Sequence, residues 1–164
     1  MFNIGDYVIC KRDLCKVKDI QDNYIKGKKY YILTPVEDES LIINIPFDNK
    51  NGLIREVIKK ERALDLINKI PQIEIIDAED RSIDAEYRAL MNSNTFEGLI
   101  KIIKTTYLRN AKRAESGKKI GDKDKDLNKR AEKYLYNEFA LALGMTYEGV
   151  EAYIKNEVEK LMRD

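Results

Sequence analysis

The stretch LCKVKDI at residues 14–20 alternates apolar and polar side chains. That alternation predicts a half-buried β-strand, because successive side chains of a strand point to opposite faces of its sheet. Other β-prone runs are YVIC, YYILT, LIINI and LIREVI, at residues 7–10, 30–34, 41–45 and 53–58. Turn residues separate these runs, so we expect five short strands in a small, strongly bent antiparallel sheet or barrel.

Helical spacing replaces this pattern from about residue 61. Pro71 ends a first short helix at residues 61–69, and residues 71–76 are expected to be extended and to join two domains. Four further helices are expected at residues 85–91, from Asn94 onward, at 125–143 and at 147–161. The sequence thus predicts an α+β chain, with a β domain at residues 1–72 and a helical domain of about four helices at 73–164.

The helix that opens at Asn94 has two distinct faces. Its apolar face is expected to carry Leu99, Ile102, Ile103 and Thr106. Lys101, Lys104 and Arg109 fall on the other faces and are expected to meet solvent.

Composition excludes several classes of function. The 164 residues include 43% apolar and 36% charged side chains, which is typical of a folded globular chain. Histidine is absent, and neither a GxxxxGK[S/T] nor a GxGxxG pattern occurs, which argues against catalytic triads and phosphate-cradling loops. No secretion signal or membrane-spanning run is visible, so we expect a cytoplasmic protein in which Cys10 and Cys15 are buried free thiols.

Positive charge is concentrated in one region although the net charge is only +1. Glu115 is the only acidic residue between Lys101 and Lys119, a segment that holds seven basic residues: Lys101, Lys104, Arg109, Lys112, Arg113, Lys118 and Lys119. Such a stripe can bind phosphates, and its alternative interpretation is a solvated helix face.

The acidic run DKDKD at residues 122–126 resembles the start of a calcium loop. Leu127 stands where that loop needs glycine and Lys133 where it needs a bidentate glutamate, so we expect a helix N-terminus and no metal. A hydrolase using Asp122 and Asp124 lacks a nucleophile and a base.

Several strings, in order along nearly the whole chain, resemble the CarD/CdnL family of RNA polymerase-binding transcriptional regulators. In the β domain these are FNIGDYVI, LIINIP and REVI, at residues 2–9, 41–46 and 55–58. In the helical domain they are LIKIIKTTYLR and KYLYNEFALAL, at residues 99–109 and 133–143.

The resemblance implies a non-enzymatic regulator without a cofactor, and we expect a monomer. A Tudor-like β domain would bind the RNA polymerase β subunit, and the helical domain would contact promoter double-stranded DNA near the upstream edge of the bubble and change open-complex stability. The implied DNA contacts are Arg109, Lys112, Arg113, Lys118 and Lys119. The expected polymerase contacts are Asn23, Ile43, Asn44 and Ile45, the last three on a run that Pro46 favours as a sheet edge.

Three departures from the family pattern bear on this interpretation. The family's minor-groove tryptophan is missing, and Ile83 or Tyr87 could replace it as a wedge or could be core residues of a short helix. Asn23 and Asn44 stand where some relatives have basic residues, and Arg12-Asp13 replaces a His-Gly turn. The alternative function is a protein-interaction adaptor whose helical domain binds another protein and not DNA.

Overall fold

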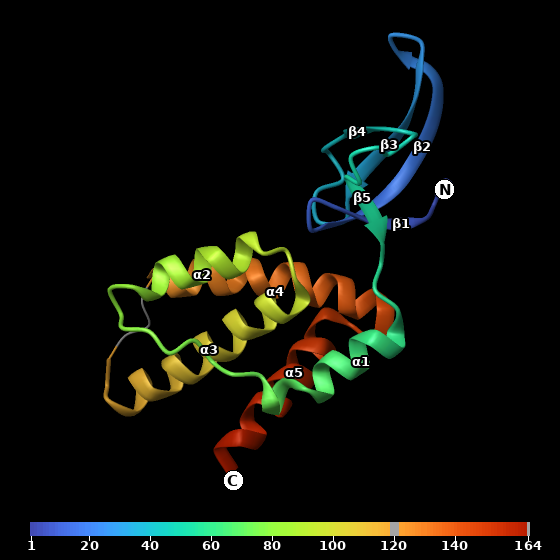
Figure 1. Cartoon of the computed structure of the whole chain (residues 1–164). Helices are drawn as coiled ribbons and strands as arrows, with labels where there is room; N and C mark the ends of the chain where they lie inside the picture. The colour runs from blue at the N-terminus through green and yellow to red at the C-terminus, as the bar shows by residue number, and fades with distance from the viewer. Residues whose placement is uncertain (119–121, 164) are drawn as a thin grey trace. The chain divides into compact units, whose positions relative to one another are not determined.

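A computed structural model describes residues 1–118 and 122–163, and the side chains of residues 1–118 and 125–160. Lys119 and the side chains of Asp122, Asp124 and Leu161 therefore lie outside the described part of the chain. The chain divides into two compact units, Met1–Ile58 and Lys59–Asp164 (Figure 1).

The first unit is an antiparallel sheet. Its strands lie in the order β4-β3-β2-β1-β5, and every neighbouring pair is antiparallel. The strands are β1 (Tyr7–Cys10), β2 (Asp13–Ile25), β3 (Lys28–Pro35), β4 (Ile43–Pro46) and β5 (Ile54–Glu56). The five predicted strands are thus present, with β2 extending five residues past residue 20.

The alternation in β2 places Cys15 and Val17 in the core, while Lys16 and Lys18 are exposed. Two shifts of register against β3, between Val17 and Asp19 and between Gln21 and Ile25, interrupt the ladder. Irregularities of this kind bend a strand and increase its twist. Long β2 can therefore curve while it pairs with both β1 and β3.

Tyr31 is the largest side chain in the core of this unit and is 1% exposed. Its ring stacks on Phe47 with centroids 4.7 Å apart, and its hydroxyl accepts a hydrogen bond of 3.1 Å from the backbone N–H of Phe2. The other buried members of this core are Val8, Cys10, Cys15, Val17, Leu33, Ile45 and Ile54. These residues come from all five strands, so the core joins the sheet into one unit.

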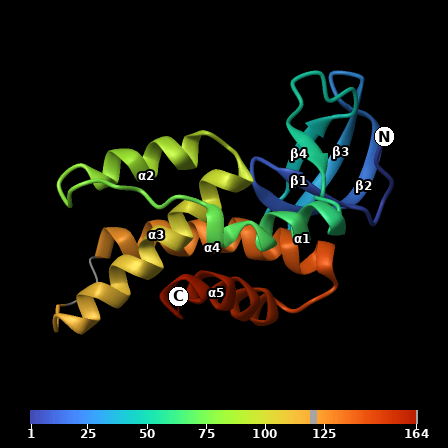
Figure 2. The ribbon, with the colours of Figure 1, turned by 60° about the horizontal axis from the view of Figure 1, so that its bottom comes forward.

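The second unit is helical. In the described residues it has a 3₁₀ turn η1 (Ile70–Gln72) and five helices: α1 (Lys60–Asn68), α2 (Ile83–Asn92), α3 (Phe96–Glu115), α4 (Asp122–Leu143) and α5 (Tyr147–Arg163). Figure 2 shows α2 along α3 and α5 along α4, and contacts join α3 to α4. The helical unit begins earlier than the expected boundary at residue 72, because α1 packs on α4 and α5 and so belongs to this unit. Helices α2 to α5 are the four expected in residues 73–164.

The predicted apolar face of α3 is buried, but burial extends beyond it to Ile100, Lys104 and Thr105. Lys101 and Arg109 are half-buried. Leu99, Ile102, Ile103 and Thr106 are buried as expected. Lys104, expected at the surface, is 2% exposed. The N-cap is Thr95, one residue later than Asn94, because its Oγ1 accepts a hydrogen bond of 3.0 Å from the N–H of Gly98.

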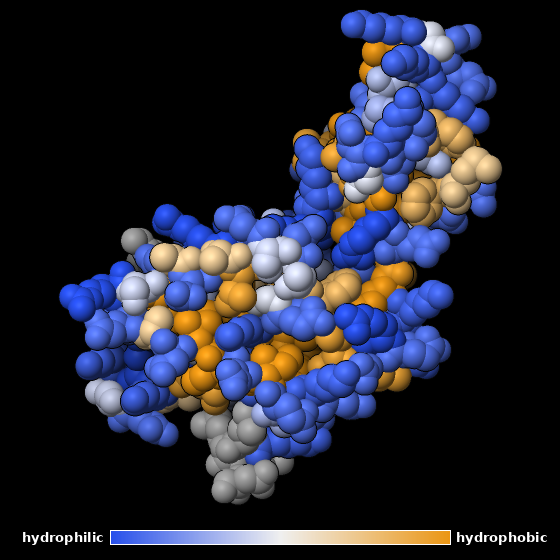
Figure 3. All heavy atoms as spheres, in the orientation of Figure 1, coloured by the Kyte–Doolittle hydropathy of each residue, from blue (hydrophilic) through white to orange (hydrophobic). Residues whose placement is uncertain are grey.

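Most surface atoms of both units belong to hydrophilic residues in the view of Figure 3, with apolar side chains visible between them. No helix in the described part of the chain is long and apolar enough to cross a membrane.

Cys10 and Cys15 are free and buried, as predicted. Burial raises the pKa of the Cys15 thiol from its ordinary value of 9.0 to about 12, so the thiolate is suppressed at neutral pH. We expect a disulfide-exchange reagent at pH 8 to leave both thiols almost unreacted in the native protein and to label both once guanidinium unfolds it. Rapid labelling of native protein would contradict this burial.

The same shift predicts a pH dependence. The unfolded chain loses the Cys15 proton above a pH of 9.0, whereas the folded chain keeps it up to a pH of about 12. The contribution of the neutral Cys15 thiol to the free energy of unfolding is therefore complete below pH 9.0 and is lost as the pH rises from 9.0 to about 12. Unfolding of Cys15→Ala by urea should therefore depend less on pH in that range than unfolding of the wild type. Equal pH dependence in the two proteins would contradict the assignment.

Candidate functional site

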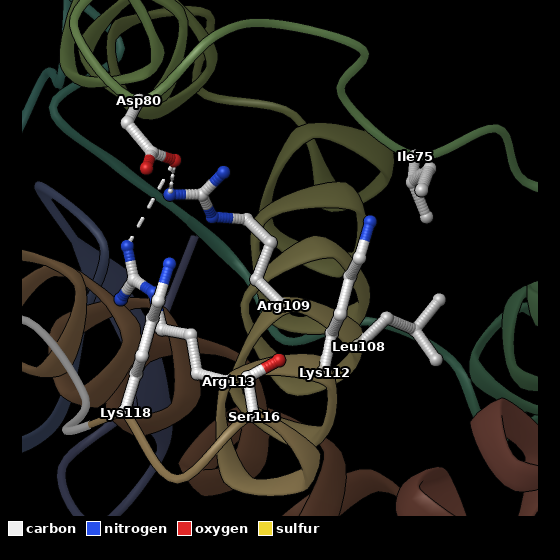
Figure 4. A pocket seen from close by; sticks show the side chains of 8 residues that line it. All are labelled: Ile75, Asp80, Leu108, Arg109, Lys112, Arg113, Ser116 and Lys118. Carbon is white, nitrogen blue, oxygen red and sulfur yellow. Dashed lines mark hydrogen bonds and ion pairs between the residues drawn. The ribbon is translucent and has the colours of Figure 1, made fainter.

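The basic residues at the end of α3 line one hollow of about 380 Å³ in the helical unit (Figure 4). Arg109, Lys112 and Arg113 project from α3, and Ser116 and Lys118 follow it. Ile75, Asp80 and Leu108 complete the lining. Lys112 and Arg113 lie in the last turn of α3, where the helix dipole favours positive charge.

Asp80 occupies the cationic end of this hollow. Its Oδ1 accepts a hydrogen bond of 2.8 Å from Nη2 of Arg109 and lies 4.0 Å from Nη2 of Arg113. This hydrogen bond is the main cause that lowers the pKa of Asp80, and the positive charges of Arg113 and Lys118 lower it further. The cluster therefore stabilises a negative charge at a defined point.

The two arginines are much less exposed than their carboxylate partner. The side chains of Arg109 and Arg113 are 18% and 22% exposed, against 82% for Asp80. A carboxylate that faces water gains little from an ion pair, so another anion can take the place of Asp80. The guanidinium groups are thus positioned by their surroundings, while the carboxylate faces solvent.

Lys104 fixes the chain segment that forms the opposite wall of the hollow. Its ammonium donates hydrogen bonds to the carbonyl oxygens of Ile70, Pro71 and Ile73, at 2.8, 3.3 and 2.5 Å. The next residue, Thr105, accepts a hydrogen bond of 2.9 Å at Oγ1 from the N–H of Ile76. Residues 70–76 are thereby bound along α3, and Ile75 lies within them.

Four of the five predicted DNA-contacting residues therefore lie together: Arg109, Lys112, Arg113 and Lys118. Lys119 lies outside the described residues. Lys104 does not belong to the basic surface, because burial and three carbonyl acceptors hold it inside the unit. Asp80 and Ile75 were not singled out from the sequence, since no local pattern indicates that they face α3.

The wedge candidates are core residues in this structure. Ile83 is 2% exposed and Tyr87 is fully buried. The Tyr87 hydroxyl accepts a hydrogen bond of 3.2 Å from Oγ1 of Thr106, which ties α2 to α3. The wedge interpretation was wrong for this conformation, because neither side chain reaches the surface to enter a base step.

The predicted polymerase contacts lie on or near a sheet edge. β4 is an edge strand, as its proline suggested. Asn44 is exposed, Ile43 is half-buried, and Ile45 points into the core at 3% exposure, so Ile45 can offer only its backbone. Asn23 is exposed near the end of β2, where its φ is +51°. It is not on β4, which pairs with β3 and not with β2.

Two apolar residues directly before β4 were not singled out from the sequence. Leu41 and Ile42 are 53% and 67% exposed. The signal was present, because both belong to the apolar run LIINI, but the run was expected to be strand throughout. They add an exposed apolar contact to the edge that β4 provides.

A second, smaller hollow of about 120 Å³ lies among α3, α4 and α5. Oδ1 of Asn110 and of Asn128 is buried there without a hydrogen-bond partner among the described residues. Burial raises the pKa of Glu132, which accepts a hydrogen bond of 2.5 Å from Nδ2 of Asn128. This space holds only a few water-sized molecules, at about 30 Å³ each.

Comparison with known proteins returned no protein-family model that matches the chain and no curated protein that matches it.

In the described residues, no three His, Cys, Asp or Glu side chains are grouped so that they could hold a metal ion.

Lys104→Met tests the role of the buried ammonium. We expect the free energy of unfolding of the helical unit to fall by about 2–4 kcal/mol, because three carbonyl groups lose their donor. Urea unfolding followed by the helical circular dichroism signal measures this change. The control is Lys101→Met, at a half-buried position on the same helix, which should change the free energy of unfolding by less than about 0.5 kcal/mol. Equal stability of the two variants would contradict the role of Lys104.

Proposed function

We propose that this protein is a non-enzymatic transcription regulator of the CarD/CdnL type. The β unit is a Tudor-like module that binds the RNA polymerase β subunit, and the helical unit contacts promoter DNA near the upstream edge of the bubble. The observation that carries the proposal is the gathering of Arg109, Lys112, Arg113 and Lys118 around one hollow. The resemblance of the strings at residues 2–9 and 99–109 to that family supplies the partners.

The charge arrangement supports DNA binding through phosphates. Arg109 and Arg113 lie four residues apart on α3, and both guanidinium groups point to the same carboxylate (Figure 4). Planar guanidinium groups bind phosphate oxygens in pairs, and each neutralised phosphate releases counterions. Because Ile83 and Tyr87 are buried, we propose backbone contacts without a wedge residue.

The sheet edge supports binding of a protein partner by strand addition. An edge strand leaves backbone N–H and C=O groups that a partner strand can pair with. β4 is such a strand, and the exposed Leu41 and Ile42 precede it. The five-stranded, bulged antiparallel sheet is also what a Tudor-like module requires.

Asp80 supports the alternative function, a protein-interaction adaptor. Its position shows that the arginine pair accepts a carboxylate, so an acidic segment of a second protein could bind there as DNA would. The two functions differ in whether duplex DNA binds the isolated protein.

The double substitution Arg109→Gln/Arg113→Gln should weaken binding to duplex DNA by on the order of tenfold, because two phosphate contacts are lost. The matched control is Lys129→Gln/Arg130→Gln, which removes two exposed charges from α4 and should leave the affinity almost unchanged. A mobility-shift titration at low salt measures both. Equal weakening by the two pairs would mean that binding follows net charge only and would contradict a site on α3.

Asn44→Glu should weaken binding to purified RNA polymerase, because a charged side chain on an edge strand opposes strand addition and this charge is opposite in sign to the basic residues that some relatives carry there. Asn51→Glu, in the exposed turn after β4, is its control and should bind normally.

The lifetime of the open complex then tests the whole proposal. The wild type should change the lifetime, and Arg109→Gln/Arg113→Gln should bind polymerase but lose the effect. If the wild type binds polymerase, and neither lifetime nor DNA affinity changes, the adaptor function is the correct one.

A further inference from the structure

The hollow at the end of α3 has two chemically different parts. In Figure 4, Arg109, Arg113 and Lys118 lie at the end where Asp80 sits, and Ile75 and Leu108 lie at the other. Lys112 projects between the two parts. A ligand that fills the hollow must therefore carry an anionic group at one end and an apolar group at the other.

Asp80 marks where the anionic group would bind. Its carboxylate already lies within 4.0 Å of both guanidinium groups, and the charge of Lys118 acts on it as well. A phosphate monoester has three terminal oxygens, so it can accept from Arg109, Arg113 and Lys118 together. It also carries about −1.5 to −2 charges at neutral pH, whereas a carboxylate carries one. Phosphate is thus the better match to three converging cations.

The apolar part is larger than a bare phosphate needs. Ile75 is 42% exposed although it is anchored between residues that bind to α3, and Leu108 is half-buried beside it. The hollow of about 380 Å³ falls in the range of roughly 300–1,000 Å³ typical of small-molecule sites. A phosphate ion alone would leave these two side chains uncovered.

We propose that this hollow binds a small organic phosphate, of the size class of a nucleoside monophosphate. The phosphate lies on Arg109, Arg113 and Lys118 in place of the Asp80 carboxylate, and the organic part covers Ile75 and Leu108. This binding deepens the proposed function, because the same cations are proposed to hold a DNA phosphate. Its regulatory consequence rests on that function: a bound nucleotide excludes DNA from the site.

Isothermal titration of the full chain with adenosine 5′-monophosphate tests the proposal, with inorganic phosphate and adenosine as partial ligands. We expect the nucleotide to bind at least about tenfold more tightly than inorganic phosphate, because burial of apolar surface adds to the affinity. Adenosine alone should not bind measurably, since it lacks the anion. Equal affinities for the nucleotide and inorganic phosphate would overturn the proposal.

Four variants locate the ligand. Arg109→Gln/Arg113→Gln should abolish nucleotide binding, whereas Lys129→Gln/Arg130→Gln should leave it unchanged. Ile75→Ser changes an exposed side chain and should reduce the affinity for the nucleotide to that for inorganic phosphate. Asp80→Asn removes the competing negative charge and should tighten nucleotide binding several-fold. Unchanged nucleotide affinity in the double arginine variant would overturn the proposal, and weaker binding by Asp80→Asn would overturn the role of Asp80.

A mobility shift with duplex DNA on the same proteins separates this inference from the proposed function. DNA binding without nucleotide binding overturns the small-ligand site and leaves the regulator intact. Nucleotide binding without DNA binding supports the site and overturns the DNA contact. When both bind, the nucleotide should displace DNA, and simultaneous binding would overturn the shared site.

Discussion

The bonds between the Lys104 ammonium and the carbonyl groups of residues 70–73 are the constraint on which the candidate site depends. A buried lysine is costly unless its protons are satisfied, and burial lowers the pKa of Lys104 accordingly. Three carbonyl acceptors offset that cost and bind the segment after η1 along α3. The same helix that buries Lys104 then carries Arg109 and Arg113, five and nine residues further on, so both sides of the hollow are positioned by α3.

The sequence predicted what local periodicity controls. Alternation in residues 14–20 predicted a half-buried strand, and the spacing of Leu99, Ile102 and Ile103 predicted the buried face of α3. Lys104 could not be placed in this way, because its three acceptors come from residues more than 30 positions earlier in the chain. The boundary between the units was missed for a similar reason, since the partners of α1 are α4 and α5, far along the chain.

The basic residues of the candidate site were predicted from the sequence, but the hollow that they line was not. Arg109 and Arg113 share a helix face because they are four residues apart, so the basic stripe was visible from the sequence. Ile75 and Asp80 reach the same hollow only because residues 70–76 are bound to α3. Their role depends on tertiary contacts that no local pattern encodes. For the wedge candidates a local pattern was enough. The amphipathic pattern of α2 indicated that Ile83 and Tyr87 are core residues, and both are buried.

The central claim is that a defined cluster of cations on α3 binds nucleic-acid phosphates. The salt dependence of duplex DNA affinity tests it most directly, because the slope of log K against log salt counts the phosphates neutralised. The four cations of the hollow predict a slope of about −3 to −4, and removal of both arginines should reduce its magnitude by about 2. A slope near zero, or the same slope with and without the arginines, would contradict the claim.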